Sequence, residues 1–323
     1  MSVEISVLVP SHFRALRLRW LLNALECQTL ERSRWEVIVG HDAGEETAAL
    51  LRAHPLAAAG VLHAAQGETG AGTPGSNRNR AFRLAQAPVV VFTDDDCFPP
   101  PDWLERVLAS VSRHPGAVIQ GPVFSDPAEA VMLRSRYPRS QQFSDVPRVW
   151  AECANIVYPR AAIEAVGGLR EGVLCGEDTD LCLRVRALGV PYLGDESIWT
   201  HHAVDEGGLR DALRGTLRWR YLVGLIHRHP ELRVQLFLGV FWRTAHFWLL
   251  VALAATPVLL DGGWRTAAAL VPWLAWACCR PLRGGGVRGA LRHLSELPGY
   301  ALVDFVEVLV LLRASLIERS LLL

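Results

Sequence analysis

Three adjacent carboxylates follow an apolar run in the first third of the chain. The run is VVVFT at 89–93, and the carboxylates are Asp94, Asp95 and Asp96. Because the run is apolar on both faces, it predicts a buried parallel strand that ends at the carboxylates. In an extended chain Asp94 and Asp96 point to the same side, so both can bind one hard cation such as Mg²⁺ or Mn²⁺. An acidic turn before a helix that begins near Asp102 is the alternative interpretation.

A second acidic cluster begins a predicted helix in the segment GEDTDLCLRVRALG at 176–189. Apolar residues recur at helical spacing through this segment, and Glu177, Asp178 and Asp180 fall in its first turn. Acids at this position suit the helix dipole, so simple capping is one interpretation. The other is a general base that takes a proton from an attacking hydroxyl. Asp178 and Glu177 are nearer the preceding loop and are the predicted catalytic residues.

Two weaker signals are consistent with a nucleotide site. Asp42 ends the run VIVGHD at 37–42, where a carboxylate can accept hydrogen bonds from a base or a ribose. The Gly-rich segment GAGTPGSNRNR at 70–80 carries Arg78 and Arg80, which suit a diphosphate group. By itself this segment would be an ordinary loop.

The remaining candidates lie outside these motifs. His201 and His202 follow a short predicted strand, and His201 is the predicted third metal or phosphate contact; a structural role for the pair is the alternative. Trp150, Glu152 and Asn155 are predicted on the acceptor side, close to a stretch in which neither periodicity nor motif gives further guidance.

The order of the predicted elements indicates an α/β fold. Short β-branched runs at 5–10, 37–40 and 89–93 alternate with helical periodicity, as at 16–30. Strand, helix, strand in this order implies a mostly parallel, Rossmann-like sheet with ligands beyond the carboxyl ends of its strands. We expect this domain to cover residues 1–235.

The composition changes after residue 235. The stretch 236–279 contains three formal charges and five of the eleven tryptophans. Residues 240–260 and 262–279 each approach the roughly 20 residues that span a bilayer, which predicts two transmembrane helices joined by a tight link around 261–263. Two buried helices of a large soluble core are the alternative.

The flanking segments extend the membrane prediction to 236–323. Four arginines and one acid at 280–296 place this flank in the cytoplasm by the positive-inside rule. The catalytic domain is then expected on the cytoplasmic face of the cell membrane. Charges interrupt 300–316 at helical spacing, which favours an amphipathic helix on the membrane surface. The basic, amphipathic stretch 209–225 is expected either on lipid headgroups or packed as a surface helix.

Composition excludes several classes of protein. The 33 basic residues, all arginine, balance 33 acidic residues, which argues against a nucleic-acid partner. Seven cysteines without a C-x-x-C pair favour reduced thiols over disulfides or a zinc site. The first apolar run lacks a preceding basic segment and a following cleavage site, so no signal peptide is expected.

Together these motifs resemble the family 2 glycosyltransferases of the membrane-associated bacterial type, which are inverting enzymes with the GT-A fold. SVLVPSHFR at 6–14 is similar to the family's opening strand and nucleotide loop, and EVIVGHDAG at 36–44 to its second strand. RNRA at 78–81 is similar to its Arg-Asn motif, TDDDCFPPPDWL at 93–104 to its D-x-D loop, and GEDTDLCLR at 176–184 to its E-D motif. Because all five motifs occur in the order expected for the family, the resemblance is specific to this family.

The resemblance implies a role for each matched residue. Asp42 would contact the nucleotide base, Asp94 and Asp96 would serve the ribose and a Mg²⁺ or Mn²⁺ ion, and Asp178 would be the catalytic base. The nucleotide sugar would be bound by Pro10, Ser11, His12, Arg14, Asp42, Arg78, Asp94 and Asp95.

This sequence departs from the family pattern at three places. His41 replaces the first of two frequent aspartates, and His12 stands where an aromatic residue often stacks on the base. Processive members carry Q-x-x-R-W after the base motif, whereas GTLRW at 215–219 has Gly215 in place of the glutamine. We therefore expect addition of one or a few sugars without extrusion of a polymer.

The predicted function is transfer of a sugar from a UDP-, GDP- or dTDP-sugar to a lipid-linked or membrane-proximal acceptor, in the synthesis of a cell-surface glycan or a glycolipid. A sugar nucleotidyltransferase is one alternative, but it would not need the membrane hairpin. A scaffold that binds nucleotide sugars at the membrane is another, and the acids at 94, 96 and 178 argue against it.

Overall fold

The structure is a computed structural model that describes residues 3–260, 265–280 and 286–323. The chain forms two compact units. The N-terminal unit contains residues 1–133 and 139–205, and the C-terminal unit contains residues 134–138 and 206–323. The division at 205 differs from the boundary expected near 235, because the helices at 209–228 pack on the last helix of the chain.

The N-terminal unit is built on a seven-stranded sheet in the order β3-β2-β1-β4-β8-β6-β9. The strands are β1 Ile5–Ser11, β2 Trp35–His41, β3 Leu62–Gln66, β4 Val89–Thr93, β6 Val118–Gln120, β8 Asn155–Pro159 and β9 Tyr192–Gly194. β1 is paired in parallel with β2 on one side and with β4 on the other, whereas β8 is antiparallel to β4 and β6. The predicted α/β fold with a mostly parallel sheet is confirmed.

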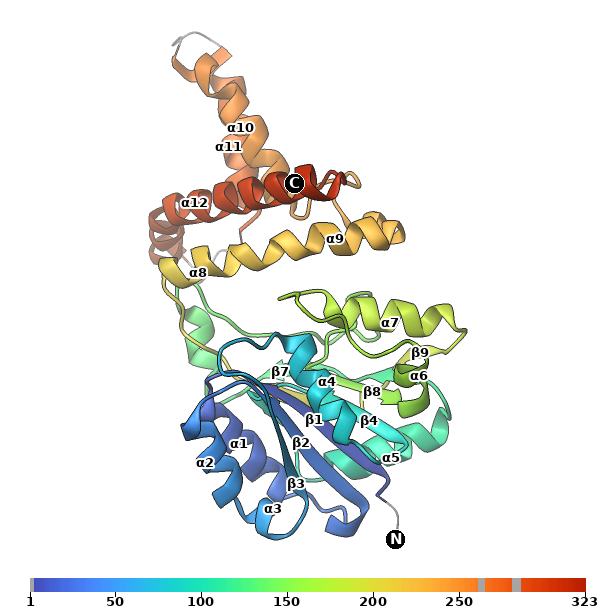
Figure 1. Cartoon of the computed structure of the whole chain (residues 1–323). Coiled ribbons are helices and arrows are strands. Elements are labelled where there is room, and N and C mark those ends of the chain that lie inside the picture. The colour runs from blue at the N-terminus through green and yellow to red at the C-terminus, as the bar shows by residue number, and fades with distance from the viewer. Residues whose placement is uncertain (1–2, 261–264, 281–285) are drawn as a thin grey trace. The chain divides into compact units, whose positions relative to one another are not determined.

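A smaller sheet in the order β5-β10-β7 lies beside the end of β4. Its strands are β5 Cys97–Phe98, β7 Val123–Ser125 and β10 Thr200–His202. The helices of this unit are α1 Ala15–Glu26, α2 Glu45–Ala53, α3 Pro55–Ala58, α4 Pro74–Leu84, α5 Trp103–Arg113, α6 Arg160–Ala165 and α7 Glu177–Ala187 (Figure 1).

The large sheet is buried on both faces because its strands are apolar on both faces. Val7 and Val9 of β1 pack in a cluster with residues of α1 and α5, whereas Leu8 packs in a cluster with residues of α4, α6 and α7. β1, β2 and β4 thus end at one edge of the sheet, where Ser11 lies opposite His41. Ligands of open α/β sheets bind at such an edge.

The C-terminal unit is helical. Its helices are α8 Leu209–Thr216, α9 Arg220–Arg228, α10 Thr244–Leu260, α11 Arg265–Cys278 and α12 Gly286–Glu318, with 3₁₀ turns η3 Leu217–Trp219 and η4 Pro230–Gln235. α10 and α11 run side by side and project from α12 (Figure 1). α12 also packs on α8 and α9.

The prediction of two transmembrane helices is corrected by the lengths of α10 and α11. α10 has 17 residues and α11 has 14, and within the described ranges no helix is both long and apolar enough to cross a bilayer. α10 begins only at Thr244 because Phe237 and Phe241 close a tight turn before it. The predicted link at 261–263, and the start of the second predicted span, lie outside the described residues. The helix expected at 300–316 is part of the longer α12.

Candidate active site

The Asp42 side chain contacts both the loop after β1 and the beginning of α4. Its carboxylate accepts hydrogen bonds from Asn77 Nδ2 at 2.9 Å and from the Gly72 amide at 2.8 Å, and it lies 2.9 Å from His12 Nδ1. Burial by itself would raise the pKa of Asp42, but these three partners lower it below its usual value. Asp42 is therefore a fixed negative charge at the end of β2, beside the more exposed His12.

Two neighbouring positions explain why α4 can lie so close to the sheet. A Cβ on Gly40 would stand 1.9 Å from the Asn77 carbonyl oxygen, so only glycine fits in β2 at this point. Pro10, the residue before the end of β1, lies directly opposite Gly40. His41 is buried beside them, and burial lowers its pKa, so its imidazole is neutral and turned away from solvent.

Arg78 connects the D-x-D loop to the E-D motif. α4 begins with a capping box between Thr73 and Ser76, which sets the register that buries the Arg78 side chain. Its Nη2 donates to Asp94 Oδ1 at 2.6 Å, and its Nη1 donates to Glu177 Oε1 at 2.7 Å. The Gly-rich segment predicted as a loop is thus partly helix, and its arginine organises the two acidic motifs.

The three adjacent carboxylates have different partners because the chain turns at residues 95–96 instead of staying extended. Asp94 is paired with Arg78, and Asp95 accepts a hydrogen bond from Ser11 Oγ at 2.8 Å. Asp96 accepts one from Arg14 Nη2 at 2.6 Å. The extended chain that was assumed for Asp94 to Asp96 is therefore corrected to a turn. Burial raises the pKa of Asp95 to about 7, although Arg14 opposes the shift.

The histidine that lies at the D-x-D loop is His202, not His201. Adjacent strand residues point to opposite faces, and in β10 the His201 ring packs on Trp199 with a centroid separation of 5.0 Å. The Nε2 atom of His202 lies 3.3 Å from Asp96 Oδ1, and both side chains are buried. The structure therefore replaces His201 with His202 as the candidate metal ligand.

The hydrogen bond of His202 leaves its second ring nitrogen in a position that suits a metal ion. Its Nδ1 donates to the Ala203 carbonyl at 2.8 Å, and Nε2 is the nitrogen that faces the Asp96 carboxylate. Carboxylate and imidazole ligands suit Mn²⁺ or Mg²⁺. Cys97 is also within reach, but burial raises the pKa of its thiol well above the usual value, so it stays protonated.

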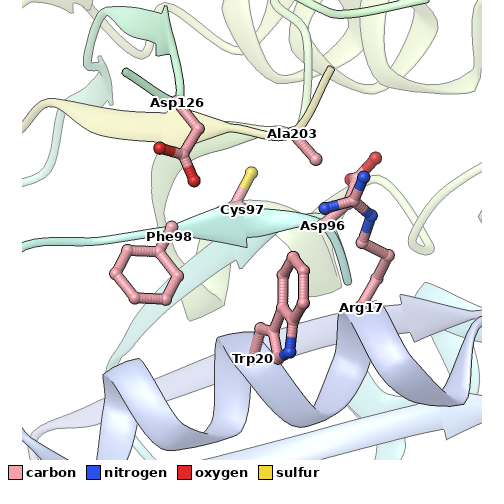
Figure 2. Close-up of a pocket in the computed structure, with 7 residues that line it drawn as sticks. All are labelled: Arg17, Trp20, Asp96, Cys97, Phe98, Asp126 and Ala203. Carbon is pink, nitrogen blue, oxygen red and sulfur yellow. The ribbon is translucent and has the colours of Figure 1, made fainter. Parts of the chain in front are cut away.

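A small cavity of about 10 Å³ lies next to Asp96, close to the volume of one water molecule. Figure 2 shows Trp20 reaching from α1 toward β5, near Cys97, and Arg17 reaching toward Asp96. Arg17 is held by ion pairs with Glu129 at 2.5 Å and Asp205 at 2.9 Å. The cavity is too small for a sugar. The side chains around it pack against the residues of the D-x-D loop.

Asp178 is the accessible acid in the first turn of α7. Glu177 and Asp180 are buried and paired with Arg78 and Arg184, whereas the Asp178 side chain is partly exposed. It accepts a hydrogen bond from the Thr179 amide at 2.8 Å. Although part of the side chain is exposed, the packing around the carboxyl group removes most of its water, and this desolvation together with the charge of Glu177 raises the pKa of Asp178 to about 8. Such a carboxylate is a strong base once it is ionised.

The three predicted acceptor-side residues have different surroundings. The Trp150 carbonyl accepts a hydrogen bond from Thr179 Oγ1 at 2.6 Å, which places this backbone beside Asp178. Glu152 is paired with Arg148 at 2.9 Å, and its charge adds to the raised pKa of Asp178. Asn155 is fully buried and donates to the carbonyls of Pro122 and Ile198, so its role is to join strands.

The comparisons with known proteins agree with this geometry. Residues 6–156 match the family model described as Glycosyl transferase family 2. The chain is thus similar to family 2 glycosyltransferases over somewhat less than half of its length. The match begins in β1 and includes β4 and the D-x-D loop, whereas α7 and the C-terminal unit lie beyond it.

Curated relatives are glycosyltransferases. Validoxylamine A glucosyltransferase from Streptomyces hygroscopicus subsp. jinggangensis is 25% identical over 274 residues, which cover 73% of this chain and 63% of the relative. Glycosyltransferase AglE from Haloferax volcanii is 22% identical over 189 residues, which cover 57% of this chain and 62% of the relative. The chain thus spans less than two thirds of the length of these relatives.

A solved structure shares the fold over most of the chain. Mannosyltransferase PcManGT from Pyrobaculum calidifontis, in complex with GDP-Man and Mn²⁺, superposes with a TM-score of 0.64 at 17% identity and covers 95% of this chain and 87% of that chain. The N-terminal unit therefore has a GT-A-like α/β fold.

Proposed function

We propose that this protein transfers a sugar from a nucleotide-sugar donor to a hydroxyl group of a lipid-linked or membrane-proximal acceptor, with inversion at the anomeric carbon. The observation that carries the proposal is the pairing of Arg78 with both Asp94 and Glu177. Through these two ion pairs Arg78 links the D-x-D loop, where the donor is proposed to bind, to the first turn of α7, which carries Asp178.

The donor is proposed to bind at the carboxyl ends of β1, β2 and β4. His12 and Asp42 would contact the base, and Ser11 and Arg14 hold the D-x-D loop in place through Asp95 and Asp96. PcManGT was solved with GDP-Man, and TarS of S. aureus, which shares the fold at 16% identity with a TM-score of 0.54, was solved with UDP-GlcNAc. Both complexes support a nucleotide sugar as donor, and we propose a UDP-, GDP- or dTDP-sugar.

The transfer step needs one base. The acceptor oxygen forms a bond to the anomeric carbon while the bond from that carbon to the diphosphate oxygen breaks, and the electron pair leaves with the nucleoside diphosphate. Asp178 takes the proton of the attacking hydroxyl. The leaving diphosphate needs no proton, so a single carboxylate is sufficient.

A divalent cation is proposed as cofactor. Asp96 and His202 are the residues that would hold it. Asp94 lies two residues earlier in the same loop. When bound, Mg²⁺ or Mn²⁺ would neutralise the negative charge that grows on the departing diphosphate.

We also propose that transfer is non-processive and takes place at the cytoplasmic face of the cell membrane. Gly215 lies in α8 at the position of the glutamine in the processive motif, and the ring of Trp219 in η3 packs at a tilt against Trp242 with a centroid separation of 5.2 Å. Trp219 thus already packs on a side chain of its own unit, which supports addition of one or a few sugars without extrusion.

The proposal is tested by the release of nucleoside diphosphate from a panel of UDP-, GDP- and dTDP-sugars in the presence of Mn²⁺. We expect turnover of one donor, which is lost in Asp96→Ala and Asp178→Asn but kept in the exposed control Glu164→Gln. Formation of a nucleotide sugar from a nucleoside triphosphate and a sugar phosphate would indicate a nucleotidyltransferase instead. Binding without turnover, even with membrane lipid extract added as acceptor, would indicate a binding protein.

A further inference from the structure

The outer side of α12 is apolar. Leu302, Phe305, Leu309, Leu312 and Leu316 recur at spacings of three and four residues, so they lie along one side of the helix. Each of these side chains is between 39% and 76% exposed. We call these five residues the outer α12 face.

The inner side of α12 carries two acidic residues, whereas Arg313 and Glu318 of the same helix are exposed. Asp304 and Glu307 are buried, with exposed fractions of 0% and 2%. Asp304 accepts a hydrogen bond from Trp276 Nε1 at 2.9 Å and is paired with Arg280. Glu307 is paired with Arg243 at 3.0 Å. In a helix that faces water, acidic side chains usually lie outside and a row of large apolar side chains lies inside, which is the opposite of what Asp304, Glu307 and the outer α12 face show.

An inside-out helix is expected where the surroundings are apolar. In a bilayer, ionisable side chains face the interior of a helix bundle and pair with one another, while apolar side chains face the lipid. The neighbouring hairpin has the same character, since Leu253 of α10 and Leu270, Val271 and Leu274 of α11 are between 40% and 63% exposed. Figure 1 shows this hairpin projecting from α12.

The positive net charge of the C-terminal unit favours lipids with anionic headgroups. Residues 134–138 and 206–323 contain sixteen arginines and eight acidic residues, a net charge of +8 with histidine neutral. The whole chain is neutral, so the positive charge is concentrated in the unit that exposes the apolar side chains. Anionic headgroups attract basic surfaces of this kind.

We propose that the outer α12 face and the exposed apolar side chains of α10 and α11 bind the surface of an anionic lipid bilayer and insert into its interfacial layer. A second copy of the chain is a poorer partner for this face, because two units of net charge +8 repel each other. The surface does not include the active-site residues, so this binding is separate from the proposed transfer reaction and would bring the enzyme to amphiphilic acceptors.

Vesicle flotation with the full-length protein tests the proposal. The probes are vesicles of phosphatidylcholine alone and of phosphatidylcholine mixed equally with phosphatidylglycerol. We expect flotation with the mixed vesicles and a loss in affinity of about 10-fold or more in Phe305→Ser/Leu309→Ser, because two apolar side chains lose their contact with the lipid. Leu84→Ser/Val131→Ser, which removes two exposed apolar side chains from the N-terminal unit, should float like the unchanged protein.

Circular dichroism and the unfolding midpoint of each variant establish that it is folded, independently of any enzymatic activity. Failure of the unchanged protein to float with the anionic vesicles would overturn the proposal, as would equal flotation of Phe305→Ser/Leu309→Ser. Light scattering is the second measurement. A dimer that becomes a monomer in this variant, without vesicle binding, would assign the face to a second copy and would also overturn the proposal.

Discussion

Arg78 and Glu177 form a buried ion pair, in which Arg78 Nη1 lies 2.7 Å from Glu177 Oε1. The two residues are 99 positions apart in the chain, on α4 and α7. The second amino group of the same guanidinium holds Asp94. The position of the D-x-D loop relative to Asp178 therefore depends on a single arginine.

Arg78→Met should destabilise the fold strongly. Removal of one partner leaves the Glu177 carboxylate buried and uncompensated, which costs about 3–5 kcal/mol. The free energy of unfolding in urea measures this loss. Arg83→Met is the matched control on the same helix, because its pair with Glu171 is exposed and should change the free energy by less than about 1 kcal/mol. Equal losses in the two variants would refute a special role of Arg78.

The pH dependence of the reaction should report the ionisation of Asp178. Burial and the negative charge of Glu177 raise its pKa to about 8, and only the ionised carboxylate can accept a proton. We therefore expect kcat/KM for the donor and acceptor to rise with pH and to level off above about pH 8. Glu177→Gln removes the neighbouring charge and should move this rise to lower pH. A profile that is unchanged in Glu177→Gln would mean that another group titrates.

Removal of the metal should abolish turnover, and the effect of a histidine variant depends on which histidine is changed. We expect EDTA to stop donor turnover and Mn²⁺ to restore it. His202→Ala should raise the Mn²⁺ concentration for half-maximal activity about 10- to 100-fold, because a metal ligand is lost. His201→Ala is the control from the opposite face of β10 and should change it little. The reverse result would support the histidine chosen from the sequence.

The pattern of apolar residues was sufficient to predict the elements that carry the site. β1, β2 and β4 are buried on both faces, so they stand out as continuous apolar runs, and the residues that follow them, such as Asp42 and Asp94, had to lie at one edge of the sheet. The acids of α7 were placed correctly at a helix start because acidic residues are favoured there.

The structure differs from the sequence-based predictions where these depend on the path of the chain through a turn. The relation of Asp94 to Asp96 assumed an extended chain, and the choice of His201 over His202 depends on which face of a three-residue strand turns inward. Nothing in the local pattern distinguishes these cases. The role of Asn77, which bonds both Asp42 and the Ser11 carbonyl, was missed for a similar reason, since the segment around it was interpreted as a loop.

Gly40→Ala should disturb the candidate active site, because α4 lies very close to β2 at this position. The added Cβ would overlap the Asn77 carbonyl oxygen, so α4 must shift, at a cost of about 1–3 kcal/mol. Because Asn77 also holds Asp42, Gly40→Ala should weaken donor binding measured by calorimetry as well as lower the unfolding midpoint. Gly215→Ala is the control, since it meets open space inside a helix and should leave both values unchanged or raise stability slightly.

The stereochemistry of the released sugar tests the central claim most directly. With water as acceptor, proton NMR follows the anomeric signal of the sugar before it mutarotates. A mechanism with Asp178 as the single base predicts that an α-linked donor first releases the β-anomer, and that Asp178→Asn releases neither. First appearance of the α-anomer, or undiminished release by Asp178→Asn, would contradict the account.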